Sequence, residues 1–331
     1  MSPAGWRGML LGVGSPPAEL AVPPAPREPA YLRLLRSGTL RARAAEAHRR
    51  LEACDLCANL CRVNRLQATV GAICRTYATA RVHAAFPHHG EEDVLRGDRG
   101  SGTIFFSHCN LRCVYCQNWE ISWKGEGATI SEEALAQAML DLQRAGCHNV
   151  NLVSPSHVAA QVLGALCLAA ERGLRLPLVW NTGGFDSLEA LRLLDGVVDV
   201  YMPDMKYADS EVARRLSHVA GYAEANRAAV REMHRQVGDL VLDERGLARR
   251  GLLVRHLVLP GGLAGTDEVL RFVAQEISPR TWVNLMAQYR PCFRATGSPP
   301  LDRRPTRDEL REALAAARRH GLTRLDPGGI C

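Results

Sequence analysis

Short apolar runs alternate with longer amphipathic stretches along the chain from about residue 100 onward. The runs have the character of buried strands, and the stretches between them repeat apolar residues with helical periodicity. The runs predict strands at 103–107, 149–154, 177–182, 197–203, 252–259 and 281–287. The amphipathic stretches predict helices at 131–145, 157–172, 186–194, 209–237, 264–276 and 306–320.

This alternation is typical of an α/β fold, in which parallel strands are joined by right-handed helical crossovers. Six strand–helix units are fewer than the eight that close a TIM barrel. The pattern alone therefore predicts a parallel sheet and leaves its closure open.

The first hundred residues lack the alternation. Residues 1–29 are rich in Pro, Ala and Gly, which predicts a disordered leader. Residues 30–52 have the periodicity of one or two amphipathic helices, whereas residues 53–100 show little periodicity and contain four cysteines. We therefore divide the chain into the leader, a helical and Cys-rich extension at 30–100, and a strand–helix region at 101–325.

The composition supports a sizeable core, since 47% of the 331 residues are hydrophobic. The net charge of +6 is spread among many arginines and forms no basic patch interleaved with aromatic residues, so we expect no nucleic-acid partner. No apolar stretch reaches the length of a membrane span, so we expect no membrane partner. Seven of the 11 cysteines fall in two metal-like groups, which indicates a reducing compartment, the cytoplasm.

The first group follows the first predicted strand and has C-x3-C-x2-C spacing: Cys109, Cys113 and Cys116. Three thiolates hold three irons of a [4Fe–4S] cube and leave the fourth iron open to a reacting ligand. The alternative is a structural zinc site with His108 as fourth ligand. The position after a strand and the aromatic residue Tyr115 before the last cysteine favour the cluster.

This run resembles the signature of the radical S-adenosylmethionine (radical SAM) enzymes. The resemblance implies a partial (β/α)6 TIM-type barrel over 101–325, with the active site at the carboxyl ends of the strands. It also implies that SAM binds the open iron and that a low-potential donor of the flavodoxin or ferredoxin type supplies an electron. SAM is then cleaved to a 5′-deoxyadenosyl radical.

Within that superfamily, the chain most resembles the activating enzymes of glycyl-radical proteins, such as the pyruvate formate-lyase activating enzyme, and among them a PflX-like branch. The resemblance extends from about Leu51 to about Gly321. It includes FFSHCNLRC at 105–113, CQN at 116–118, NLVSPSH at 151–157, VYMPDMKY at 200–207 and RHLVLPGG at 255–262.

This closer resemblance implies an oxidoreductase that activates a partner protein by abstracting a hydrogen atom from a glycine. One alternative is a radical SAM enzyme that acts on a small molecule or a protein side chain. Another is an iron–sulfur electron-transfer or scaffold protein without SAM chemistry.

Polar residues at the ends of later strands are candidates for contacts to SAM. Met202, Asp204 and Lys206 share one parity on the fourth strand, so they point the same way. By resemblance, Asp204 helps to hold a cation, Lys206 approaches SAM and Arg255 binds the SAM carboxylate. Asn181 stands where the activating enzymes have an Asp, which removes a charge from the expected cation site.

The second strand lacks the Gly-Gly-Glu run with which many radical SAM enzymes bind the SAM amino group. Ser154, Ser156 and His157 are the candidates there, and Ser154 is retained as the cofactor contact together with Tyr115. His256 is expected to contact an outer helix, and Gln288 is a further candidate on the adenine or substrate side.

The second group of cysteines precedes the strand–helix region. Its members are Cys54, Cys57, Cys61 and Cys74. Four thiolates suit either a structural zinc ion or a second iron–sulfur cluster. The spacing therefore predicts a metal without naming it, and unmetallated buried thiols are the remaining alternative.

Overall fold

The computed structural model describes residues 28–330. Almost all of the predicted leader, and Cys331, lie outside the described residues. No helix between residues 28 and 330 is both long and apolar enough to cross a bilayer.

Between residues 28 and 330, six strands run parallel, and each pairs with the next of the six along the chain. They are β2 (Ser101–Phe106), β4 (Val150–Val153), β5 (Leu178–Thr182), β6 (Val200–Pro203), β8 (Ala248–Leu257) and β9 (Trp282–Met286). The six predicted strands and the α/β fold are confirmed. Because β9 pairs with β8 and not with β2, the sheet is an open, partial barrel.

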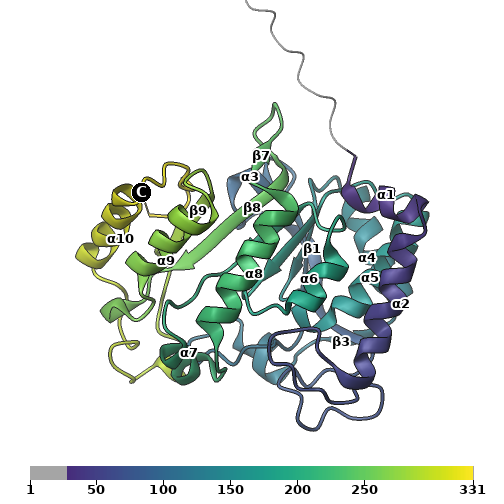
Figure 1. Ribbon diagram of the computed structural model, residues 1–331, viewed down its shortest axis with the longest axis horizontal. Helices are drawn as coiled ribbons and strands as arrows, with labels where there is room; N and C mark the ends of the chain where they lie inside the picture. Colours follow the sequence, from purple (N-terminus) through teal and green to yellow (C-terminus); the bar gives the residue numbers. More distant parts are fainter. Residues whose placement is uncertain (1–27, 331) are drawn as a thin grey trace, which may run out of the picture.

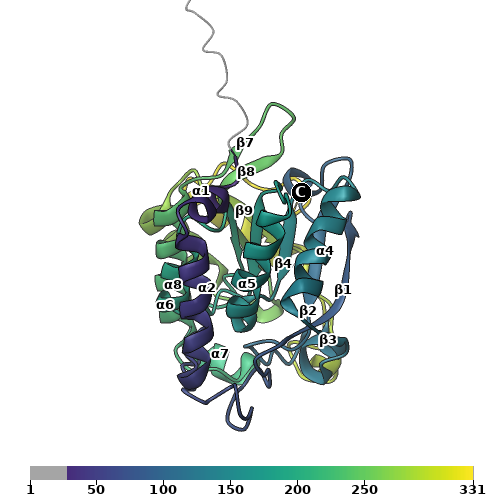
Figure 2. The same ribbon diagram turned by 90° about the vertical axis from the view of Figure 1, so that its right-hand side faces the viewer.

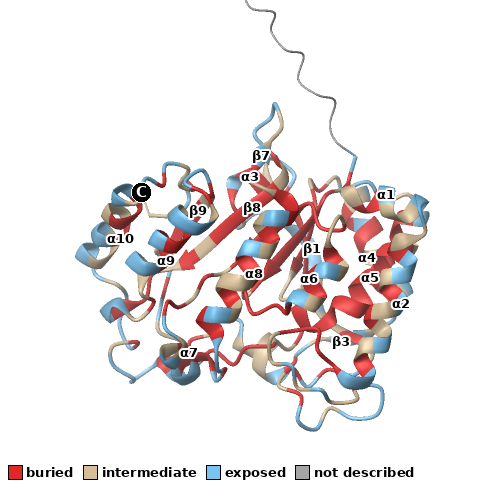
Figure 3. Cartoon of the chain, viewed as in Figure 1, coloured by how far each residue is buried: buried red, intermediate tan, exposed pale blue. Residues whose placement is uncertain are grey.

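Helices cover the outer face of this sheet (Figures 1 and 2). They are α4 (Glu132–Arg144), α5 (Ala159–Glu171), α6 (Leu188–Leu194), α7 (Ser210–Ser217), α8 (Tyr222–Val237), α9 (Thr266–Phe272) and α10 (Arg307–Arg319). Buried residues concentrate in the strands and on the helix faces turned toward them (Figure 3). Ser131 caps α4 by accepting from the backbone N–H of Ala134, as its N-cap position requires.

The predicted helix at 209–237 is wrong in one respect, because the chain breaks it into α7 and α8. His218 and Gly221 have φ angles of 55° and 64°, in the left-handed region that cannot continue a helix. The break directs the carboxyl end of α7 to the cysteine loop, where Arg112 N–H donates to the carbonyl of Ser217 at 3.0 Å.

The hydrophobic pattern of the sequence did not predict three of the strands. β1 (Ala80–His88) pairs antiparallel with β2 at the edge of the sheet, β3 (Ala128–Ile130) pairs with β1, and β7 (Val241–Leu242) pairs with β8. β1 is largely open to solvent, so it lacks the continuous apolar run of the buried parallel strands. Short helical turns connect other elements: α3 (Asp93–Arg96), η1 (Arg50–Ala53), η2 (Glu120–Lys124), η3 (Ser156–Val158), η4 (Pro260–Gly262), η5 (Val273–Ile277) and η6 (Phe293–Ala295).

The predicted amino-terminal helices are α1 (Ala30–Arg36) and α2 (Thr39–Arg49), which pack beside α5 (Figure 2). Tyr31 is fully buried and donates its hydroxyl to the carbonyl of Leu176 at 2.9 Å. The 30–100 extension is thus tied to the barrel by helix packing and by the pairing of β1 with β2.

Candidate active site

A cavity of about 270 Å³ opens at the carboxyl ends of the parallel strands. Residues at or just after the carboxyl ends of β2, β4, β5, β6, β8 and β9 all contribute to its lining. Among the residues predicted from the sequence, the cavity gathers Cys109, Cys113, Tyr115, Cys116, Ser154, Asn181, Asp204, Lys206, Arg255 and Gln288.

The cysteine loop is held at this cavity by backbone and side-chain hydrogen bonds. Cys113 Sγ lies 3.0 Å from the hydroxyl of Ser217, and Cys116 Sγ lies 3.1 Å from that of Ser122. The backbone N–H of Leu111 donates to Cys109 Sγ at 3.4 Å. Each of the three sulfur atoms therefore has a polar neighbour that can stabilise its thiolate.

The loop fits a [4Fe–4S] cluster better than a single ion. Burial raises the pKa of all three thiols, and each lies within electrostatic range of another, while the ammonium of Lys206 opposes the rise. The three thiols line one cavity that has room for a further ligand, which matches a cube with three irons held by the protein and the fourth iron open.

A row of ion-paired residues also lines the cavity. Lys206 Nζ donates to Asp204 Oδ2 at 2.6 Å, and Arg255 Nε donates to Asp204 Oδ1 at 3.0 Å. Arg255 Nη2 donates to Asn181 Oδ1 at 2.7 Å. Residues from β5, β6 and β8 thus form one continuous polar row, which we call the Asn181–Lys206 row; it comprises Asn181, Arg255, Asp204 and Lys206.

The charges of this row stabilise one another. Burial opposes ionisation of Asp204, but Lys206 and Arg255 outweigh it and hold the pKa of this carboxyl below its usual value. Burial likewise opposes the charge of Lys206, yet Asp204 and the thiolate of Cys113 raise the Lys206 pKa well above normal. The row is therefore fully charged at neutral pH, which suits the zwitterionic end of an amino-acid ligand.

Glu91 is a neighbour of the row that the sequence did not reveal. Its Oε2 lies 3.8 Å from Arg255 Nη1, and its side chain is buried. Burial raises the pKa of Glu91 to about 7, with Arg255 opposing the rise. Glu91 lies in the loop after β1, a strand that the pattern did not predict, so no sequence signal placed it near the barrel.

The residues after β4 are only partly at the cavity. Ser154 lines it and has a φ angle of 58°, and its N–H donates to the carbonyl of Asn181 at 2.8 Å. Ser156 and His157 are buried and do not belong to the lining. The hydroxyl of Ser156 contacts Thr182 Oγ1 at 2.9 Å, and the His157 ring lies 3.0 Å from the carbonyl of Ser107. Their placement is structural.

His256 lies on the opposite side of β8 from Arg255. Its ring nitrogens contact the carbonyl of Met205 at 2.6 Å and the hydroxyl of Thr266, at the start of α9, at 2.9 Å. Burial lowers the pKa of His256 to about 4, so the ring is neutral. This agrees with the expected contact to an outer helix.

A chain of buried hydroxyl groups connects the cysteine loop to the loop after β6 and to the end of α7. Tyr115 and Tyr207 share a hydrogen bond of 2.5 Å, and Tyr207 contacts Ser217 Oγ at 2.7 Å. The chain ends at Cys113 Sγ. Tyr115 therefore lines the cavity with its ring, while its hydroxyl is engaged away from it. Sequence reasoning missed Tyr207 and Ser217, because a continuous helix would have carried Ser217 away.

Glycine is required at one point of the rim. Gly184 has a φ angle of 74°, and a Cβ there would lie 2.2 Å from the carbonyl oxygen of Asp204. The loop after β5 can therefore approach the row only without a side chain at this position.

The four cysteines of the extension lie at the same end of the barrel. Cys57 forms a β-bridge with Asp186, which follows β5. Cys54, Cys57 and Cys74 are buried and Cys61 is half-buried. All four lie within electrostatic range of others in the group. They do not line the cavity at the strand ends.

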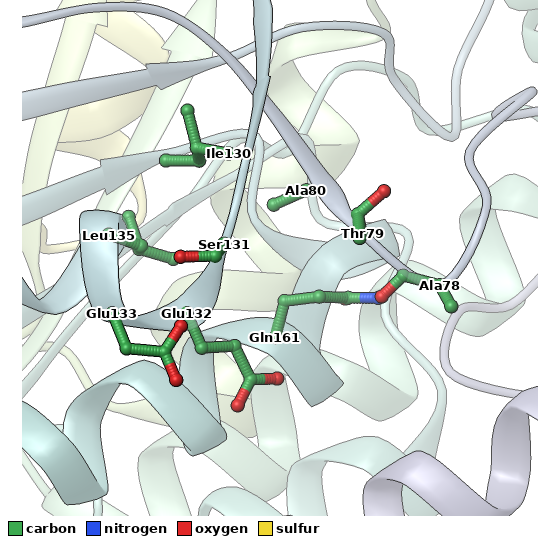
Figure 4. Close-up of a pocket in the computed structure, with 9 residues that line it drawn as sticks. All are labelled: Ala78, Thr79, Ala80, Ile130, Ser131, Glu132, Glu133, Leu135 and Gln161. Atoms are coloured by element: carbon green, nitrogen blue, oxygen red, sulfur yellow. The ribbon is translucent and has the colours of Figure 1, made fainter.

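Another cavity, of about 240 Å³, lies between the start of β1 and the first turn of α4 (Figure 4). Glu132 lies 2.6 Å from the ring of His48, and Gln161 donates to the carbonyl of Ala78 at 2.6 Å. It brings together none of the predicted site residues, so the strand-end cavity is the candidate active site.

Comparison with known proteins bears on this site. Residues 103–244 match the family model described as "Radical SAM superfamily". The "Uncharacterized protein MJ0674" of Methanocaldococcus jannaschii is 33% identical over 276 residues, which cover 81% of this chain and 75% of that protein.

Two solved structures are similar at a lower level. A radical SAM methyltransferase from Sphaerobacter thermophilus has a TM-score of 0.43 and 16% identity, over 88% of this chain and 89% of that one. TYW1 with a lysine-pyruvate adduct bound has a TM-score of 0.41 and 13% identity, over 66% of this chain and 73% of that one. The matched family model shows that the chain contains a domain of the radical SAM superfamily, whose enzymes use a [4Fe–4S] cluster and SAM.

Proposed function

We propose that the strand-end cavity binds SAM between the cysteine loop and the Asn181–Lys206 row, and that the enzyme activates a partner protein by abstracting hydrogen from a glycine. The observation that carries the proposal is the convergence of Cys109, Cys113 and Cys116 with that row on one cavity. The three cysteines would hold the cluster, which when bound supplies the electron that cleaves SAM to a 5′-deoxyadenosyl radical.

The row supports binding of the methionine end of SAM. Arg255 uses Nε and Nη2 within the row, and its Nη1 makes only the longer ion pair with Glu91. That nitrogen therefore has N–H groups left to donate to a carboxylate. Lys206 fixes Asp204, whose remaining acceptor capacity suits an ammonium group. Ser154, which directly follows β4, lines the same cavity and adds a hydroxyl to it.

The choice of a partner protein as target rests on the resemblance of residues 105–113, 151–157, 200–207 and 255–262 to the activating enzymes. The cavity opens at the strand ends, so a segment of a partner protein can approach SAM from the rim.

The first test is anaerobic reconstitution with iron and sulfide, followed by SAM and dithionite. We expect a [4Fe–4S] spectrum and release of 5′-deoxyadenosine. A protein that carries the cluster and releases none contradicts the proposal and supports a scaffold or electron-transfer role.

The second test concerns the target. The reconstituted enzyme is incubated with a glycyl-radical protein encoded beside its gene, labelled with deuterium at the glycine α-carbon. Hydrogen transfer from that carbon to C5′ of the radical would place deuterium in 5′-deoxyadenosine and leave a glycyl radical visible by EPR. Unlabelled 5′-deoxyadenosine, with deuterium arriving instead from a labelled small molecule, would replace the activating role by the small-molecule alternative.

A further inference from the structure

We infer that Cys54, Cys57, Cys61 and Cys74 hold a second [4Fe–4S] cluster that relays electrons to the cluster at Cys109, Cys113 and Cys116. The inference rests on the proposed function, since it assigns the entry path of the electron that SAM cleavage consumes. It follows from the buried charge beside the four thiols, their mutual spacing and the contacts that connect the two loops.

A buried cation indicates that the four thiols form an anionic centre. Arg65 is almost fully buried, and its Nη1 lies 3.5 Å from Cys54 Sγ. Its other hydrogen bonds go to the carbonyls of Thr76, Tyr77 and His157. Among the residues of known position, it makes no ion pair with a carboxylate. A buried guanidinium needs a counter-charge, and thiolates that bind metal supply one.

The four thiols lie near one another. Cys57 and Cys61 each interact electrostatically with both Cys54 and Cys74, and Cys54, Cys57 and Cys74 are buried. Four thiolates can hold either a zinc ion or an iron–sulfur cluster. The cluster is the metal we infer, because the contacts between this loop and the barrel loop offer an electron path that redox-inactive zinc does not use.

Asn59 connects the two cysteine loops directly. Its Nδ2 lies 3.7 Å from Cys57 Sγ and donates to the carbonyl of Asn110 at 2.7 Å. Asn110 follows Cys109 in the chain, and its own amide oxygen lies 3.7 Å from Cys109 Sγ. One side chain thus bridges a sulfur of the second group to the residue bonded to a ligand of the first.

Arg112 makes an independent connection beside it. Its Nη2 donates to the carbonyl of Ile73, which precedes Cys74, and its Nη1 donates to the carbonyl of Ser122 at 2.8 Å. Its charge interacts with both Cys109 and Cys74. Electron transfer slows steeply with distance and is faster along bonded paths, so two such bridges suit a relay.

The outer side of the second group is accessible to a donor. Leu60, Leu66, Val70 and Tyr77 are exposed apolar residues of this loop, which projects from the strand-end side in Figure 1. Arg62 and Arg75 are exposed beside them. Arg62 pairs with Asp55 at 2.9 Å. The exposed apolar side chains and the charge of Arg75 suit an acidic one-electron carrier of the flavodoxin or ferredoxin type.

The electron balance is simple. The reduced carrier loses one electron, and the second cluster passes from the 2+ to the 1+ state. That electron then moves to the catalytic site and returns the second cluster to 2+. No proton or bond changes in the relay; the bond that breaks is the sulfonium carbon–sulfur bond of SAM.

Metal content tests the site. The full chain is reconstituted anaerobically with ferrous iron and sulfide and examined by Mössbauer spectroscopy. We expect about eight irons and eight sulfides per chain, and about four of each in both a C57A/C61A and a C113A/C116A variant. Cys167→Ala, in helix α5, is the matched control and keeps about eight.

About four irons with one zinc, or four irons alone, in an unaltered chain that releases 5′-deoxyadenosine would overturn the inference and leave the proposed function standing. About eight irons without 5′-deoxyadenosine would keep the second cluster and overturn the proposed function.

The relay is tested by the ratio of two rates of 5′-deoxyadenosine formation, with reduced flavodoxin and with dithionite. Dithionite is small enough to reduce a cluster at the cavity directly. We expect this ratio to fall sharply in C57A/C61A, and also in Asn59→Leu, which keeps all four cysteines and so tests the path without removing the cluster. Cys167→Ala keeps the ratio. An unchanged ratio in both variants would overturn the relay.

Discussion

The two cysteine loops differ in what surrounds their thiols. The barrel loop at 109–116 follows a buried strand, offers three thiols and borders a cavity crossed by the Asn181–Lys206 row. The loop at 54–79 has no regular strand and offers four thiols, with the buried Arg65 beside Cys54 and no share in that cavity. Three ligands beside a cavity leave room for a reacting molecule, whereas four ligands close a site.

The largest expected difference between the loops concerns SAM cleavage. Cys113→Ala removes a ligand of the catalytic cluster, so dithionite-driven release of 5′-deoxyadenosine should fall to the background of SAM without enzyme. Cys57→Ala should keep measurable release under the same conditions. Liquid chromatography measures the 5′-deoxyadenosine that each variant releases. An equal loss of release in the two variants would contradict the assignment of the first site as open to SAM and the second as closed.

Removal of Arg65 should loosen the outer loop. Arg65→Met deletes its hydrogen bonds to the carbonyls of Thr76, Tyr77 and His157. Because a hydrogen bond to a charged group contributes about 1.5–3 kcal/mol, we expect a loss of about 3 kcal/mol in the free energy of unfolding. Urea denaturation measures it. Arg75→Met, at an exposed position of the same loop, should change the free energy of unfolding by no more than about 0.5 kcal/mol. A loss as large as that of Arg65→Met would show that Arg65 does not stabilise the loop specifically.

Neutralising the row should cost less. Asp204→Asn leaves Lys206 and Arg255 without their shared counter-charge. We expect about 2 kcal/mol of destabilisation, below the 3–5 kcal/mol of fully buried pairs because the three side chains keep 13–18% exposure. Glu211→Gln, in an exposed pair with Arg214, should change stability by about 0.5 kcal/mol or less.

The lowered pKa of Asp204 also predicts how the stability of the fold changes with pH. The folded-state pKa of Asp204 is lowered, so its ionisation stabilises the fold above the ordinary value of 3.8. The contribution is lost as the pH falls through the lowered pKa. The wild-type chain should therefore lose more stability than Asp204→Asn on acidification, and parallel curves would contradict the role of the ion pairs.

The smallest expected effect concerns the polar support of Cys113. Ser217→Ala removes the hydroxyl that lies 3.0 Å from its sulfur. Hydrogen bonds to cluster sulfurs help to set the reduction potential and favour the more negative, reduced state. The midpoint potential of the catalytic cluster should therefore become more negative in an EPR-monitored titration. Thr39→Ala, outside the site at the start of α2, should leave it unchanged; an equal shift there would contradict a local cause.

The comparison also shows what the sequence could predict. The parallel strands are buried on both faces, so they form apolar runs that the sequence pattern could predict. Most of the polar residues predicted at the ends of these strands line one cavity. Asp204 and Lys206 lie together as expected, but β6 ends at Pro203, so the ion pair between them and not strand alternation holds the two side chains together. Exposed β1 carries no such run, and the loop after it brings Glu91 to Arg255 without any local signal.

Other parts of the site depend on backbone conformations that composition does not encode. The left-handed residues between α7 and α8 bring Ser217 to Cys113, whereas the pattern predicted an unbroken helix. The contacts of Asn59 and Arg112 join segments about fifty and forty residues apart in the chain, so spacing alone gave no hint of them.

The strand order has a consequence for how the protein is made. All seven grouped cysteines lie before residue 117, whereas Asn181, Asp204, Ser217 and Arg255 emerge from the ribosome later. While the chain is being translated, the thiols of both loops lack the residues that later surround them. The cavity is complete only once β9 has been synthesised, so a stably shielded catalytic cluster is a product of late maturation, and chains truncated before β9 would expose their cysteines to oxygen.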